Sequence, residues 1–178
     1  MKQPLRLHRR LGLLLGIAAA ALAFAAVAAA APGNGAVRIP VGNEPSDLGP
    51  EYCGFPIHVA VVSDNEYIVH DTFKADGTEI LQITGKLVMS FTNEDTGKSV
   101  VENTSGPGTI TFPRDGSFAE DAHGNGAFPF DPSDQASTGE PGLVFYSGHL
   151  AVTYGPTGPA QSFMLSGTQT DGCALLGG

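Results

Sequence analysis

Short runs of β-branched and aromatic residues follow one another from Tyr52 to the end of the chain, and this pattern restricts the fold more than any other feature. No stretch after Cys53 places apolar residues at helical spacing over three turns, and Gly, Pro, Asp and Asn separate the runs. The pattern indicates an all-β domain. We predict strands near residues 55–63, 66–74, 78–92, 98–104, 108–112, 116–122, 143–154 and 160–168.

The segments between these strands have the residues of tight turns, which indicates consecutive antiparallel hairpins. Asp64-Asn65 tolerate positive φ angles and suit a two-residue hairpin. Residues 75–77 and 113–116 each end in a glycine that closes a turn in the left-handed conformation, and residues 93–97 form a longer version. Gly85 interrupts a predicted strand, where it bends the strand or marks a bulge.

Cys53 and Cys173 are the only cysteines, and they stand just before the first predicted strand and just after the last. In an oxidising compartment an even pair is most simply one disulfide. Closing so long a loop stabilises a fold by about 4–5 kcal/mol in the chain-entropy account. We therefore predict a single β domain, residues 53–176, in which an antiparallel meander of about eight strands closes into a barrel-like fold; the alternative is a β-sandwich.

The first thirty residues have the three-part layout of a secretory signal peptide. A basic start that includes Arg9-Arg10 precedes the uncharged run Leu11–Ala30, and an A-x-A site ends at Ala30. We predict that residues 1–30 are cleaved off before Ala31 and that the protein is secreted. The alternative is a membrane-tethered protein, because the run is long enough to span a bilayer. The arginine pair leaves twin-arginine export open beside the general route.

Residues 31–52 are rich in Gly, Pro, Asn, Asp and Glu, and we predict a flexible leader there. Removal of residues 1–30 would leave five Lys and Arg against eighteen Asp and Glu, a formal charge of −13. Such a surface repels nucleic-acid phosphates and anionic lipid head groups, so we expect neither as a partner. It suits solubility outside the cell, with a cationic partner or bound calcium as the functional alternative. We expect a monomer.

Three groups of residues give the chain a recognisable pattern. Cys53-Gly54-Phe55-Pro56 opens the first strand, Thr92-Asn93 and Thr96-Gly97-Lys98-Ser99-Val100 lie in a central hairpin, and Cys173-Ala174-Leu175-Leu176 ends the domain. With the basic, alanine-rich signal, the chain resembles a group of small secreted proteins of high-GC bacteria over most of residues 53–176. These landmarks are turns and a disulfide, so the resemblance implies a shared fold and no particular activity.

The sequence has no motif of a common enzyme class: no phosphate loop, dinucleotide fingerprint, H-E-x-x-H or G-x-S-x-G. The four histidines after residue 30 have no tight metal-ligand spacing, so we predict no metal site and no cofactor, with a zinc site assembled from separate strands left open. The acidic residues at 94–95, 120–121 and 131/134 do not match an EF-hand loop.

One polar pair can be aligned from the predicted turn at Asp64-Asn65. That turn places His58 directly opposite Asp71 on one face of the hairpin. A carboxylate beside a histidine orients the ring as in a general base, and the plainer interpretation is a solvated cross-strand pair. A register change of one residue would remove the pairing.

The segment 123–142 joins two predicted strands with about twenty residues rich in Gly, Pro, Asp and Ser. Structureless loops of this length are uncommon and are often lids, binding loops or disordered inserts. Phe128 and Phe130 lie inside it. We predict that these rings pack on the core or contact a ligand, and that Tyr146 and His149 of the following strand belong to the same ligand site.

Together these features favour a non-enzymatic secreted β-barrel that binds a small apolar ligand or a cell-envelope partner. The alternatives are a small secreted hydrolase or isomerase that uses acidic residues or His58, and a structural or interaction protein without a pocket. A large apolar cavity would favour the binding protein, and two carboxyl groups in one cleft would favour the enzyme.

Overall fold

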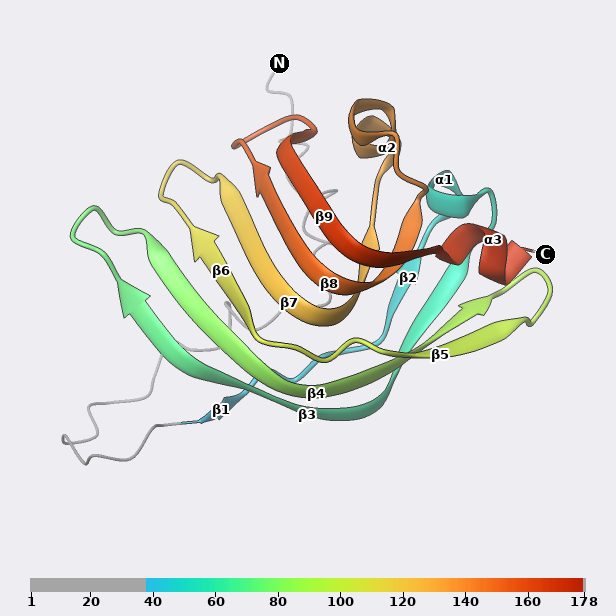
Figure 1. Cartoon of the computed structure of the whole chain (residues 1–178), viewed down its shortest axis with the longest axis horizontal. Helices are drawn as coiled ribbons and strands as arrows, with labels where there is room; N and C mark the ends of the chain where they lie inside the picture. Colours follow the sequence, from blue (N-terminus) through green and yellow to red (C-terminus); the bar gives the residue numbers. More distant parts are fainter. Residues whose placement is uncertain (1–37, 178) are drawn as a thin grey trace, which may run out of the picture.

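The computed structural model describes residues 38–177, which form one curved antiparallel sheet with three short helices (Figure 1). The predicted signal segment 1–30, with its cleavage site, and residues 31–37 lie outside the described residues. The elements in chain order are β1 (Ile39–Pro40), β2 (Ser46–Leu48), α1 (Pro50–Cys53), β3 (Ile57–Phe73), β4 (Glu79–Asn93), β5 (Ser99–Asn103), β6 (Gly108–Phe112), β7 (Phe118–Pro129), α2 (Pro132–Thr138), β8 (Leu143–Tyr154), β9 (Ala160–Asp171) and α3 (Gly172–Gly177).

The strands lie in the order β1-β3-β4-β6-β7-β8-β9, with β2 also paired to β3 and β5 also paired to β4. The sheet is not closed, because among the described strands β9 pairs with β8 alone. The predicted barrel is therefore wrong, whereas the all-β antiparallel class is confirmed. One edge of the sheet is formed by β1 and β2, which both pair with β3, and the other edge is β9.

The apolar side chains form three clusters on this sheet. Phe91 of β4 and Phe145 of β8 are three strands apart in the sheet order, yet their rings meet edge to face with centroids 4.9 Å apart. The sheet therefore curls until its two halves pack together.

The buried members of the three clusters are as follows. Cluster 1 contains Leu48, Tyr52, Ile57, Val59, Leu87, Met89, Phe91, Leu143, Phe145 and Leu176. Cluster 2 contains Phe128, Phe130, Val144, Tyr146, Leu150 and Val152, and cluster 3 contains Val41, Ile68, Leu81, Ile83 and Ile110.

A row of glycines marks the place where the C-terminal strands bend. Gly124, Gly148 and Gly167 lie opposite one another on β7, β8 and β9. Gly124 has a φ of 102° and Gly167 a φ of 109°. A Cβ at Gly167 would press on the backbone of β8, and a Cβ at Gly124 would press on the backbone of residues 105–106, which precede β6. Glycines at these positions allow the close approach of neighbouring backbone. Figure 1 shows that β7, β8 and β9 bend together.

β8 has the predicted bounds, and its first residues explain why both of its faces are apolar in the sequence. Leu143 and Phe145 pack in cluster 1, whereas Val144 and Tyr146 pack in cluster 2 on the other face. The start of β8 therefore lies between two parts of the core.

The hairpin turns predicted at residues 75–77, 93–97 and 113–116 are confirmed. Each ends in a glycine whose backbone N–H donates to a carbonyl three or four residues earlier. The turn predicted at Asp64-Asn65 is wrong, because β3 runs unbroken and both residues pair with β4. Pairing along the whole of β4 outweighs the local turn preference of two residues.

Because that turn is absent, the predicted pair of His58 and Asp71 is wrong as well. His58 lies opposite Thr92, and Asp71 lies opposite Leu81. The partner of His58 is Asp47 of β2, whose Oδ1 atom lies 2.7 Å from the Nδ1 atom of His58. A cross-strand histidine–carboxylate pair exists, but with a residue from the predicted leader.

Two segments that we predicted to lack regular structure contain strands and helices. Residues 38–52 of the predicted leader include β1 and β2, and Val41 and Leu48 are buried. In the predicted loop 123–142, β7 continues to Pro129 in register with β8, and α2 follows. The predicted loop of about twenty residues without regular structure is therefore wrong. The glycines that suggested a loop lie within β7, where the strand bends.

The predicted disulfide between Cys53 and Cys173 is confirmed, with Cα atoms 5.1 Å apart. It joins the end of α1 to α3 and so links the near-terminal regions of the domain. Within residues 38–177, no helix is long and apolar enough to cross a membrane.

Candidate functional site

The inner face of the sheet, which we define as the face that bears Ile110 and Tyr146, contains a pocket of about 100 Å³. Glu66 of β3, Glu120 of β7 and Tyr146 of β8 provide its acidic and phenolic groups. The curvature of the sheet brings these three strands around one space. The other lining residues are Ile83, Leu87, Met89, Thr104, Gly106, Gly108, Ile110, Ala122, His123, Asn125, Gly126 and Ala127.

Glu66 is buried, with 7% of its surface exposed, although it carries a carboxyl group. The side-chain amide of Asn43 donates to its Oε2 atom at 3.0 Å, and the backbone N–H of Glu66 donates to Oδ1 of Asp64 at 2.9 Å. Burial raises the pKa of Glu66 to about 7, against a lowering by the Asn43 hydrogen bond, and the Asp64 charge adds to the rise.

Glu120 reaches the same pocket from β7, where it lies between Ile110 of β6 and Val152 of β8. Within the described part of the chain, its carboxyl group makes no hydrogen bond and no ion pair. Burial raises the pKa of Glu120 to about 7, and the negative charge of Glu66 contributes to the rise. The two carboxyl groups therefore interact, and no basic side chain among residues 38–177 pairs with either.

Tyr146 closes the pocket with a buried phenol, 7% of whose surface is exposed. Among residues 38–177 its hydroxyl has no hydrogen-bond partner. Gly126 lies directly opposite on β7, and a Cβ at that position would overlap the ring and its hydroxyl. Burial, followed by the negative charge of Glu120, raises the pKa of Tyr146, so the phenol stays neutral at physiological pH.

This arrangement combines a mostly apolar wall with two carboxyl groups and one hydroxyl. A buried carboxylate without a cationic partner is unfavourable, and a bound cation or hydrogen-bond donor relieves that cost. The pocket is therefore suited to a small molecule that has an apolar body and a cationic or hydrogen-bond-donating end.

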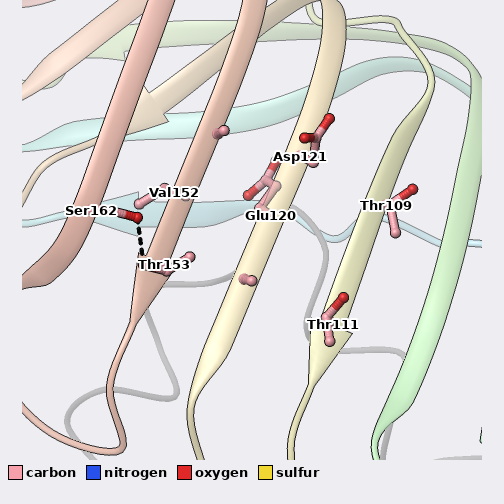
Figure 2. Close-up of a pocket in the computed structure, with 9 residues that line it drawn as sticks. Thr109, Thr111, Glu120, Asp121, Val152, Thr153 and Ser162 are labelled. Atoms are coloured by element: carbon pink, nitrogen blue, oxygen red, sulfur yellow. Dashed lines mark hydrogen bonds between the residues drawn. The ribbon is translucent and has the colours of Figure 1, made fainter. Parts of the chain in front are cut away.

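The outer face of the same strands carries a second set of polar residues. Figure 2 shows the small side chains around a shallow depression of about 180 Å³ on this face. The hydroxyl groups of Thr153 and Ser162 are hydrogen-bonded there at 2.6 Å. The depression is lined by Thr109, Thr111, Ala119, Glu120, Asp121, Ala151, Val152, Thr153 and Ser162, and of these Glu120 also borders the inner pocket.

Three of the four residues predicted to contact a ligand meet in cluster 2, and His149 lies apart from them. Phe128 and Phe130 are buried in cluster 2, where Phe130 has no exposed surface and its ring meets Phe163 edge to face. Tyr146 belongs to that cluster and also lines the inner pocket, whereas His149 lies on the outer face. The two phenylalanines pack in the core, as one of the two predicted roles had it, and a ligand role stays a prediction for all four residues.

Glu66 and Glu120 were missed as individual site residues, although part of the signal was present in the sequence. Glu66 stands two residues before Ile68, and Glu120 two residues after Phe118, so strand alternation places each carboxyl on an apolar face. The sequence could not indicate that these two carboxyl groups meet. β3 and β7 are separated by β4 and β6 in the sheet order, and only the curvature brings them together.

No family of known proteins, no curated protein and no solved structure matches this chain. The resemblance to small secreted proteins of high-GC bacteria therefore stays a prediction. Function is inferred from the chemistry of the sites.

Proposed function

We propose that this chain is a secreted, non-enzymatic binding protein that holds a small amphipathic molecule in the inner pocket. The cationic or hydrogen-bond-donating end of the ligand contacts Glu66 and Glu120, and its apolar body contacts the aliphatic wall. One observation carries the proposal: two carboxyl groups without a basic partner converge on one pocket, beside the unpaired hydroxyl of Tyr146.

The charge of the pocket favours a cationic ligand over the wholly apolar ligand expected from the sequence. An apolar molecule would remove water from Glu66 and Glu120 and give nothing in exchange, which is unfavourable for a carboxylate. An ammonium group would donate hydrogen bonds to both carboxyl groups. The net charge of −13 without residues 1–30 also attracts cations to the protein.

The size of the pocket limits the ligand. An apolar cavity of about 150 Å³ holds benzene. A pocket of about 100 Å³ therefore suits a short alkyl chain or the edge of a ring and excludes a lipid tail. A larger molecule, or a protein at the cell envelope, would insert only one side chain or one end group.

We place the site of action outside the cytoplasm. The segment 1–30 has the layout of a signal peptide, and a disulfide between Cys53 and Cys173 persists in an oxidising compartment. Detection of the mature protein in the culture medium, starting at Ala31 by N-terminal sequencing, would test both secretion and the cleavage site.

Calorimetric titration at pH 8 with n-butylammonium, n-butanol and butyrate tests the ligand class, because the three probes differ mainly in the charge of one end. We expect butylammonium to bind most tightly and butyrate not to bind. Glu66→Gln should weaken butylammonium binding at least tenfold, about 1.4 kcal/mol, and affect butanol little. Glu94→Gln removes the same charge from an exposed turn and should change nothing. Equal binding of all three probes, or of none, would contradict the proposal.

A second candidate is acid–base catalysis by the same pair, because two carboxyl groups in one cleft are the residue set of many small hydrolases. His58 is not part of that set, since it pairs with Asp47. Turnover of small ester, amide or glycoside substrates that is lost in both Glu66→Gln and Glu120→Gln would favour the enzyme. Binding without turnover favours the binding protein.

A further inference from the structure

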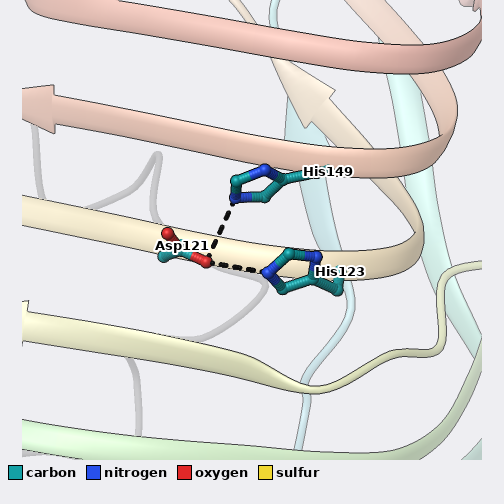
Figure 3. Close-up of side chains that lie close together, drawn as sticks. All are labelled: Asp121, His123 and His149. Carbon is teal, nitrogen blue, oxygen red and sulfur yellow. Dashed lines mark hydrogen bonds and ion pairs between the residues drawn. The ribbon is translucent and has the colours of Figure 1, made fainter.

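The outer face of β7 and β8 brings together two imidazoles and one carboxylate, as Figure 3 shows. Asp121 and His123 are two residues apart on β7 and share a face, and His149 lies directly opposite His123 on β8. The Nε2 atoms of both histidines lie 3.2 Å from Oδ1 of Asp121. The two rings stack with centroids 4.0 Å apart and planes 10° apart.

We propose that Asp121, His123 and His149 form a binding site for a divalent transition-metal ion such as Zn²⁺. The ligand atoms of the three residues all lie within 4.8 Å of one another. Zinc binds imidazole nitrogen and carboxylate oxygen at about 2.0–2.2 Å, so neighbouring ligand atoms of a tetrahedral site are about 3.3 Å apart. The two nitrogen–oxygen distances of 3.2 Å agree with that separation.

The donor set selects the class of metal. Two imidazole nitrogens and one carboxylate oxygen suit Zn²⁺, Cu²⁺, Ni²⁺ and Fe²⁺. Ca²⁺ and Mg²⁺ prefer oxygen ligands throughout and are disfavoured here. Only the carboxylate of Asp121 is anionic, so the three ligands neutralise one of the two positive charges of the metal ion. The remaining positive charge attracts a further ligand.

The position of the site leaves coordination positions open. The side chains of His123 and Asp121 are 58% and 56% exposed, and that of His149 is 27% exposed. Three protein ligands with a free fourth position are the pattern of zinc sites that bind water or an exogenous ligand. Asp121 also borders the depression lined by Thr109 and Thr153, so an added ligand has a polar surface beside the metal.

The simpler alternative is a hydrogen-bonded cluster in which Oδ1 of Asp121 accepts from both Nε2–H groups. That arrangement requires both imidazoles to carry the proton on Nε2 and to share one acceptor. A metal ion replaces both protons and uses all three groups at once. The two arrangements differ in a measurable property, since only the second binds one metal ion per chain.

The test uses the disulfide-bonded protein prepared without a polyhistidine tag. Isothermal titration with Zn²⁺ should show one site per chain, and Co²⁺ should give the visible absorption of a tetrahedral complex. His123→Gln, His149→Gln and Asp121→Asn should each weaken zinc binding at least tenfold. Asp121→Asn retains an acceptor oxygen and so tests ligation apart from hydrogen bonding. His70→Gln removes an exposed histidine of β3 and should leave the affinity unchanged.

Absence of stoichiometric zinc binding by the wild type would overturn the proposal. Unchanged binding in both His123→Gln and His149→Gln would do so as well, because the metal would then lie elsewhere. Circular dichroism of each variant separates loss of the site from loss of the fold. Butylammonium binding by Asp121→Asn should stay at the wild-type level, so the outer site and the inner pocket are tested independently.

Discussion

Glu120 and Asp121 are consecutive residues of β7 whose carboxyl groups lie on opposite faces of the sheet. Glu120 lies in the inner pocket near Glu66, and Asp121 contacts His123 and His149 on the outer face. The two-residue period of a β-strand is the cause, because successive side chains point to opposite sides. One strand thus supplies a half-buried carboxyl that lacks a partner and an exposed one that has two.

Glu66→Gln should stabilise the protein at pH 8 and have little effect at pH 4.5. The pKa of Glu66 is about 7 in the folded protein against an ordinary value of 4.5, so between these values the folded state binds more protons than the unfolded state. Stability therefore falls as pH rises from about 4.5 through 7, by an amount on the order of 3 kcal/mol for this group. Glutamine has no such dependence and can still accept from Asn43.

Urea unfolding of wild type and Glu66→Gln at pH 4.5, 6, 7 and 8 checks this prediction. The difference between the two proteins should grow with pH and level off above pH 7. Glu94→Gln, in an exposed turn, serves as the control for charge alone. A pH-independent difference for Glu66→Gln would mean that the carboxyl group is solvated in the folded protein.

Phe130→Ala should destabilise the protein by about 3–5 kcal/mol, because the ring has no exposed surface and packs on Phe128 and Phe163. Phe73→Ala removes a ring that is 68% exposed and should cost less than about 0.5 kcal/mol. Chemical unfolding measures both. The affinity of folded Phe130→Ala for butylammonium should equal that of the wild type. A loss of affinity in a variant that stays folded would show that Phe130 contributes to ligand binding.

Gly126→Ala should lower stability by about 1–3 kcal/mol, since the added methyl group overlaps the ring of Tyr146. Gly108→Ala is a matched control on the neighbouring strand β6, where the nearest side-chain atom to the new Cβ is 3.7 Å away, an ordinary contact. Thermal unfolding distinguishes them. Equal behaviour of the two variants would show that Tyr146 moves without cost and does not define the pocket wall.

Replacing both cysteines, Cys53→Ser with Cys173→Ser, should lower the free energy of unfolding by up to about 4–5 kcal/mol. The cross-link closes a loop with a sequence separation of 120 residues, which restricts the unfolded chain. Unfolding of the wild type with and without a reductant should reproduce the effect of the double variant. If reduction leaves the midpoint unchanged, the near-terminal regions are held by packing alone.

The sequence by itself determined the local features of this protein. Alternation placed the bounds of β8, glycines placed three hairpin turns, and the positions of Cys53 and Cys173 indicated their disulfide. Each of these depends on residues close together in the chain, or on two unique thiols. The turn expected at Asp64-Asn65 does not form, because both residues pair with β4. The pairing along the whole of β4 outweighs the local turn preference of these two residues.

Only the tertiary structure decided the sheet's closure and the composition of both sites. The edge formed by β1 and β2 does not pair with β9, so the sheet is open, and the glycine row at Gly124 lies where it bends. That curvature brings Glu66 to Glu120, which are separated by two strands in the sheet, and register alone brings His149 to His123. Such meetings depend on strand order, register and bend, three properties set by the packing of the whole chain and not by any local stretch.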